Sequence, residues 1–89
     1  MYEIFETSVA RKDKEKLKSM SPAVKKRFEN IVVSLSEDPF KEIFGFEELK
    51  YNDAPKLYSV ELTKKDRVVY SVNDNTITIY QYLGHYNDK

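Results

Sequence analysis

The fold is decided by residues 67–82, which read RVVYSVNDNTITIYQY. Apolar and polar residues alternate up to Val72, and the run from Thr76 to Tyr82 is rich in residues that favour strands. Between the two runs, Asn73-Asp74-Asn75 is typical of a turn. The segment therefore predicts a β-hairpin, because strands joined by a short turn must pair antiparallel.

Two helices are predicted ahead of this hairpin. Thr7 or Ser8 can cap a first helix that runs to about Ser19. Ser21-Pro22 is a stronger start signal, since the serine hydroxyl caps the helix and proline suits its first position. Pro39 ends this second helix. The apolar residues of the second helix fall on one face: Val24, Phe28, Ile31, Val32 and Leu35.

Shorter strand-like runs at 2–6, 48–51 and 57–62 complete the order β-α-α-β-β-β-β. This order predicts an α+β fold, in which two N-terminal helices pack on one face of a small antiparallel sheet and leave the other face open. There is no internal repeat or linker-like segment. We therefore expect residues 1–89 to form a single domain.

Parity along the strands predicts which side chains reach the open face. A three-residue loop at 64–66 keeps the apolar residues together, so that Val60 opposes Tyr70 and Leu62 opposes Val68 on the helix side. We place four side chains on the open side: Glu61, Thr63, Arg67 and Val69. Tyr58 and Tyr70 we assign to the core.

Composition excludes several kinds of protein. The chain has no cysteine and its only histidine is His85, which argues against a disulfide framework and against a zinc site. We expect no metal and no other cofactor. The longest aliphatic run, Ile31-Val32-Val33, is far shorter than the roughly 20 apolar residues of a membrane span. The N-terminus lacks a signal-peptide pattern, so we expect a cytoplasmic protein without a membrane partner.

The charges cancel over the whole chain but not locally. From Arg11 to Glu29, eight basic residues face three acidic ones, and from Glu37 to Glu61, seven acidic residues face three basic ones. A basic helical stretch is compatible with nucleic-acid binding and equally with a solvated helix face. The net charge of zero counts against strong non-specific affinity for nucleic acid.

Side chains that can cleave a phosphodiester without a metal occur in the second half of the chain. Glu47 can take the proton of a 2′-hydroxyl, and His85 can protonate the departing 5′-oxygen. The planar donors of Arg67 match phosphate oxygens and can stabilise the charge that builds there. Tyr86 can stack on an unpaired base or donate a hydrogen bond to phosphate. Taken singly, each residue also suits an ordinary surface or packing role, so the hypothesis depends on their joint occurrence.

The order and spacing of these residues resemble the YoeB/Txe type of bacterial toxin, within the RelE superfamily of ribosome-dependent mRNA endoribonucleases. The motifs that carry the resemblance span roughly residues 21 to 86. They are Pro39-Phe40, Glu47-Glu48-Leu49-Lys50, Lys65-Asp66-Arg67-Val68-Val69-Tyr70 and His85-Tyr86.

The resemblance implies Glu47 as general base, Arg67 as transition-state stabiliser, His85 as general acid and Tyr86 as a residue that positions the scissile nucleotide. Lys50 would contact the RNA backbone, and the hairpin-loop residues Lys64 and Lys65 are further RNA-binding candidates. The family cuts mRNA in the ribosomal A site without a metal and is held inactive by a co-expressed antitoxin. The implied partners are therefore a cognate antitoxin, the ribosome and mRNA, and a homodimer is left open.

Three departures from the family pattern leave an alternative open. Glu61 stands where family members carry an arginine, Phe46 and Glu48 replace prolines on either side of Glu47, and the chain is neutral where the family is basic. The alternative is a catalytically weak or inactive homologue that acts mainly as an antitoxin-binding module. The basic stretch 11–18 motivates a third reading, an RNA-binding or RNA-cleaving domain independent of ribosomes.

Overall fold

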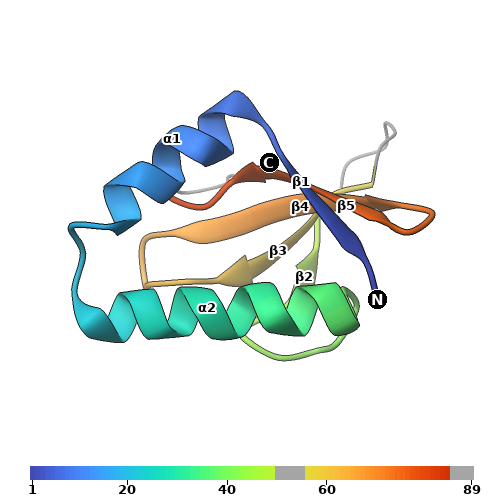
Figure 1. Cartoon of the computed structure of the whole chain (residues 1–89). Coiled ribbons are helices and arrows are strands. Elements are labelled where there is room, and N and C mark those ends of the chain that lie inside the picture. The colour runs from blue at the N-terminus through green and yellow to red at the C-terminus, as the bar shows by residue number, and fades with distance from the viewer. Residues whose placement is uncertain (50–55, 85–89) are drawn as a thin grey trace.

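The computed structural model describes residues 1–49 and 56–84 (Figure 1). Its elements are β1 (Glu3–Glu6), α1 (Ser8–Leu17), α2 (Pro22–Glu37), β2 (Glu47–Glu48), β3 (Tyr58–Glu61), β4 (Arg67–Asn73) and β5 (Thr76–Gln81). In Figure 1, α2 runs across the sheet, and the axis of α1 is inclined to the axis of α2. The predicted α+β order is confirmed. β2 begins one residue before the predicted strand at 48–51, of which residues 50 and 51 lie outside the described ranges.

Both helices begin where the capping residues predict. The hydroxyl of Thr7 accepts a hydrogen bond of 3.2 Å from the backbone N–H of Ala10. The hydroxyl of Ser21 accepts one of 3.3 Å from Val24. Each hydroxyl satisfies a backbone donor that has no partner inside its helix. The second helix ends at Glu37, shortly before the proline that was expected to stop it.

The five strands form one sheet in the order β1-β5-β4-β3-β2. All neighbours pair antiparallel except β1, which pairs with β5 in parallel. The expectation of a wholly antiparallel sheet is wrong at this edge. A short turn enforces antiparallel pairing only between consecutive strands, and both helices separate β1 from the rest of the sheet.

The helices cover one face of the sheet, and the core lies between them. Its buried residues come from both helices and from β3, β4 and β5: Ala10, Leu17, Ile31, Leu35, Val60, Leu62, Val68, Tyr70, Ile77, Ile79 and Tyr82. The predicted core position of Tyr70 is confirmed, and its hydroxyl donates a hydrogen bond of 2.6 Å to the carbonyl of Pro39. Burial, with the nearby charges of Tyr58 and Asp38, raises the pKa of Tyr70, so its phenol stays a neutral donor.

The register of the β3–β4 hairpin differs from the predicted one. Val60 opposes Val68, and Tyr58 opposes Tyr70. The pairs predicted from a three-residue loop, Val60 with Tyr70 and Leu62 with Val68, are therefore wrong. The shift is by an even number of residues, so every side chain keeps its predicted face.

The cause of the shift is a longer loop, which covers residues 62–66. The carbonyl of Asp66 accepts hydrogen bonds from the N–H groups of Leu62 and Thr63, at 2.9 and 3.2 Å. The hydroxyl of Thr63 accepts from the N–H groups of Lys65 and Asp66, at 3.1 and 3.0 Å. A side-chain turn of this kind closes the loop before the strands can pair further.

The second face of the sheet is less open than predicted. On it, Ser59 and Val69 are only 0% and 1% exposed. The side chain of Arg67 extends over Ser59, and its Nε donates a hydrogen bond of 2.9 Å to the serine hydroxyl. The long arginine thus covers part of the sheet while its charged end reaches the surface.

A β-bulge alters the end of β5. Val69 pairs with Gln81, whereas the next residue, Tyr70, pairs with Ile79, so Tyr80 is the extra residue. Because of this insertion, Tyr82 belongs to the core on the helix side. The bulge leaves the face of Arg67 unchanged, since the β3–β4 pairing is regular.

Candidate active site

Arg67 is the first residue of β4 and lies opposite Glu61 on β3. Besides its bond to Ser59, its Nη2 donates a hydrogen bond of 2.6 Å to the carbonyl of Gly45. The side chain is 21% exposed. Two hydrogen bonds from different nitrogens fix the plane of the guanidinium, which is the requirement for a directional phosphate clamp.

Glu47 begins β2, the short edge strand, and is the cross-strand partner of Ser59. Its carboxylate lies 3.8 Å from Nη2 of Arg67, and its side chain is 62% exposed. Glu47, Ser59 and Arg67 therefore share one face at the end of three neighbouring strands. The structure brings together the two predicted catalytic residues that it describes.

The loop before β2 is held in place by aromatic packing. The ring of Tyr58 contacts Phe40 edge to face at 5.3 Å and stacks with Phe46 at 5.8 Å. The carbonyl of Phe44 accepts a hydrogen bond of 2.6 Å from the N–H of Glu61. Phe44 and Gly45 both have positive φ angles, 57° and 64°, a conformation that costs little for glycine alone. These contacts aim the Gly45 carbonyl at Arg67 and place Glu47 beside it.

Gly84 lies on the other side of Arg67. Its carbonyl accepts hydrogen bonds of 3.0 Å from the backbone N–H of Arg67 and from Nε2 of Gln81. Its N–H donates a bond of 2.7 Å to Oδ1 of Asp66. The last described residue is therefore fixed next to Arg67. Three predicted site residues, Lys50, His85 and Tyr86, lie outside the described residues.

The chain that leads to Gly84 is also tied to α1. Oδ2 of Asp13 accepts hydrogen bonds from the N–H groups of Tyr82 and Leu83, at 3.0 and 3.1 Å. Asp13 is buried, with 8% of its surface exposed. A buried carboxylate that accepts two backbone hydrogen bonds joins the first helix to the C-terminal segment.

The matching family model covers residues 6–86 and describes a YoeB-like toxin of a bacterial type II toxin–antitoxin system. The chain belongs to this family. The predicted resemblance to YoeB within the RelE superfamily is thus confirmed. No curated protein matches the chain.

Several solved structures of toxins are similar to this YoeB-like chain. The YoeB dimer from Staphylococcus aureus is 26% identical, with a TM-score of 0.81 over 96% of this chain and 98% of the other. The YoeB/ParE toxin from Agrobacterium tumefaciens is 21% identical, with a TM-score of 0.83 over 94% and 99%. The heterotetrameric YoeB–YefM toxin–antitoxin complex from S. aureus matches at 25% identity and a TM-score of 0.78, over 97% and 99%.

The two described lysines of the predicted RNA-binding set, Lys64 and Lys65, are both exposed in the 62–66 loop. Lys64 also lines a hollow of about 330 Å³ together with Arg27, which comes from α2. The guanidinium of Arg27 lies 4.9 Å from the ring centre of Phe44, and its Nε donates a bond of 3.0 Å to the carbonyl of Glu61. Arg27 and Lys64 therefore bring positive charge to this hollow of the YoeB-like toxin, which Glu61 also lines.

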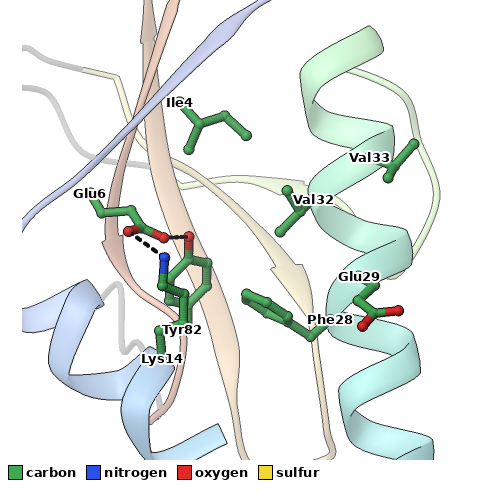
Figure 2. Close-up of a pocket in the computed structure, with 8 residues that line it drawn as sticks. All are labelled: Ile4, Glu6, Lys14, Phe28, Glu29, Val32, Val33 and Tyr82. Atoms are coloured by element: carbon green, nitrogen blue, oxygen red, sulfur yellow. Dashed lines mark hydrogen bonds and ion pairs between the residues drawn. The ribbon is translucent and has the colours of Figure 1, made fainter. Parts of the chain in front are cut away.

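A separate hollow of about 460 Å³ lies between β1, α1 and α2 (Figure 2). Its polar corner is formed by Glu6, which accepts hydrogen bonds from the hydroxyl of Tyr82 and from Lys14. Burial alone would raise the pKa of Glu6, but these two bonds and the charges of Lys14 and Arg11 lower it. Neither Glu47 nor Arg67 lines this hollow.

Within residues 1–49 and 56–84, no three His, Cys, Asp or Glu side chains converge as they would around a metal ion. In the same ranges, neither helix has the length and hydrophobicity needed to cross a bilayer.

Sequence reasoning missed the residues that support the site. The bond that Arg67 donates to Ser59 depends on the corrected hairpin register, so the sequence alone could not pair them. The role of Asp13 depends on how α1 packs, and a single aspartate in a lysine-rich helix gives no signal of it. Asp66 was part of the family motif, but nothing in the motif indicated that it binds Gly84.

Proposed function

We propose that this toxin is a ribosome-dependent, metal-independent endoribonuclease that inhibits translation by cutting mRNA in the A site. The observation that carries the proposal is the arrangement around Arg67. Its guanidinium is ion-paired with Glu47, and its backbone N–H is bonded to Gly84, which directly precedes His85. Family membership supports the same activity.

In the proposed reaction, the carboxylate of Glu47 takes the proton of the 2′-hydroxyl as its oxygen attacks phosphorus. The bond from phosphorus to the 5′-oxygen breaks, and His85 donates a proton to the leaving oxygen. The products are a 2′,3′-cyclic phosphate and a free 5′-hydroxyl. Arg67 stabilises the negative charge on the phosphate oxygens during this step.

The remaining predicted residues bind the RNA. Tyr86 positions the scissile nucleotide by stacking or by a hydrogen bond to phosphate. Lys50, Lys64 and Lys65 contact the backbone, and their contribution weakens as salt rises.

The Glu47–Arg67 ion pair has to loosen when a phosphate enters. At 3.8 Å it is long, and the glutamate is largely exposed. An exposed pair of this kind contributes about 0–1 kcal/mol, so its exchange for a phosphate contact costs little. The bond from Arg67 to Ser59 can persist during the exchange and keep the guanidinium oriented toward the phosphate.

The proposed partners are a cognate antitoxin, the ribosome and mRNA, which places the protein in the cytoplasm. The antitoxin complex and the dimer of S. aureus YoeB support an antitoxin partner and a homodimer here. The antitoxin would keep the site inactive until it is removed.

The test compares wild type with Glu47→Gln, Arg67→Ala and His85→Ala on mRNA bound to programmed ribosomes and on naked mRNA. We expect wild type to cut only the ribosome-bound mRNA, and each variant to lose roughly 10²-fold to 10⁴-fold in rate. Glu48→Gln is the matched control, because it removes a neighbouring carboxylate that is ion-paired with Lys56 and not with Arg67. Cleavage of naked mRNA at the same rate, or wild-type rates in all variants, would contradict the proposal.

The position of Glu61 favours a second candidate, an antitoxin-binding module that has lost productive contact with the ribosome. Glu61 places a negative charge on the strand position opposite Arg67. In that case Glu61→Arg should create cleavage where wild type shows none. Full-rate cleavage by wild type removes this candidate.

A further inference from the structure

We propose that Asp66 is a positioning residue for the general acid, because it holds Gly84, the residue that precedes His85, next to Arg67 by accepting its N–H. This inference rests on the proposed nuclease function. Residues 62–66 and 67–73 thus form one unit that carries the phosphate clamp and anchors the C-terminal segment.

The two carboxylate oxygens of Asp66 have separate tasks. Oδ2 accepts a hydrogen bond of 2.7 Å from the hydroxyl of Thr63 and so belongs to the hairpin turn. Oδ1 accepts the bond of 2.7 Å from Gly84, which lies 18 positions further along the chain. A role in the turn explains only the first of these bonds.

The peptide groups on both sides of the Gly84 Cα are fixed. Asp66 holds the N–H, while Arg67 and Gln81 hold the carbonyl, whose carbon is bonded to the nitrogen of His85. The φ angle of Gly84 is 101°, which a side-chain-bearing residue rarely adopts. The position and orientation of Gly84 beside Arg67 are thereby set.

Electrostatics gives an independent reason to assign Asp66 a positioning role. A carboxylate beside Lys64 and Lys65 opposes the approach of a phosphate backbone. RNA binding therefore does not explain an acidic residue at this position, and its presence needs another explanation. Its two short hydrogen bonds, one of them to the segment before His85, supply that explanation.

Three variants separate the two tasks of Asp66. Asp66→Ala removes both hydrogen bonds. Asp66→Asn keeps one oxygen, which can still accept from Gly84. Thr63→Ala removes all three bonds that the Thr63 hydroxyl makes within the turn and leaves the carboxylate of Asp66 able to accept from Gly84. It is therefore the control for damage to the hairpin.

On ribosome-bound mRNA, we expect kcat of Asp66→Ala to fall about 10-fold to 100-fold with KM changed by less than about threefold, because the general acid is misplaced and not removed. Asp66→Asn should recover most of the rate, and Thr63→Ala should stay close to wild type. If Thr63→Ala lowers kcat as much as Asp66→Ala, the turn alone explains the effect and the inference is wrong.

A second measurement does not depend on activity. Amide hydrogen exchange at Gly84 should quicken at least about 10-fold in Asp66→Ala and stay near wild type in Thr63→Ala. His85 is the only histidine, so its imidazole resonance reports the same change without overlap. Unchanged exchange and an unchanged resonance in Asp66→Ala would overturn the inference. If wild type fails to cut mRNA while exchange responds as expected, the nuclease proposal fails and the anchoring of Gly84 by Asp66 stands.

Discussion

Glu61 and Arg67 are cross-strand partners in β3 and β4, yet the guanidinium of Arg67 is ion-paired with Glu47 on the next strand. The contacts to Ser59 and Gly45 turn the arginine across the sheet and toward β2. Glu61 thus adds negative charge at the edge of the proposed phosphate site without neutralising its clamp.

We expect Glu61→Gln to lower KM for ribosome-bound mRNA by up to about fivefold, because a nearby, partly exposed charge contributes about 0.2–1 kcal/mol. The value of kcat should stay the same, since Glu61 takes no part in the reaction. Initial rates at several mRNA concentrations and two salt concentrations measure both constants. Glu48→Gln, which changes the net charge equally, should leave KM unchanged. An equal effect of both substitutions would mean that only the net charge matters.

Replacement of Arg67 by lysine should fail to preserve activity although the charge is kept. A single ammonium cannot reproduce the two bonds that Nε and Nη2 make to Ser59 and Gly45. We expect kcat to fall about 10²-fold and the free energy of unfolding to fall by about 1 kcal/mol. Arg11→Lys is the control, because Arg11 donates to the carbonyl of Glu6 in β1, at the opposite edge of the sheet from Glu47. A wild-type kcat in Arg67→Lys would show that the planar guanidinium is not needed.

Sequence patterns predicted the elements well because each has a local cause. Thr7 and Ser21 cap helices through hydroxyls that lie beside the backbone groups they satisfy. The parallel pairing of β1 and the hairpin register were missed, because both depend on distant contacts. The register in particular goes with the longer loop at 62–66, which is closed by the backbone bonds to the Asp66 carbonyl as well as by the Thr63 hydroxyl, and no periodicity of apolar residues reveals it.

The candidate site was predictable only through the family pattern. No property of Glu47 alone separates it from the other acidic residues of this neutral chain. The pattern paired it with Arg67, and the structure places the two in contact. It gave no role to Ser59, Gly45 or Asp66, although Asp66 belongs to one of its motifs, since these residues act through hydrogen bonds that the motif does not encode.

The buried hydroxyl of Tyr70 should contribute to stability. It donates to the carbonyl of Pro39 and so anchors the loop that leads to Glu47. Tyr70→Phe leaves that carbonyl without its donor, and we expect a loss of about 1–3 kcal/mol in unfolding free energy, measured by urea denaturation. Because the pKa of Tyr70 is raised on folding, this contribution is present below the ordinary value of 10.0 and disappears as the pH rises through the folded-state value. Tyr2→Phe serves as the control, since Tyr2 packs against the core but is only partly buried.

The contacts of Glu6 predict a loss of stability in acid. Its pKa is lowered on folding by the bonds from Tyr82 and Lys14 and by the charges of Lys14 and Arg11, against the effect of burial. A carboxylate with a lowered folded-state pKa stabilises the protein above its ordinary value of 4.5, and this contribution is lost as the pH falls through the folded-state pKa.

At neutral pH, Glu6→Gln should therefore reduce the free energy of unfolding by about 1–2 kcal/mol. The difference in unfolding free energy between Glu6→Gln and wild type should narrow below pH 4.5. Glu15→Gln, which removes a carboxylate that is 70% exposed and paired with Lys18, should cost less than about 0.5 kcal/mol. Denaturant titrations of the three proteins at a series of pH values measure these differences in unfolding free energy. A gap between wild type and Glu6→Gln that stays constant from neutral to acid pH would show that the carboxylate of Glu6 acts through its shape and not through its charge.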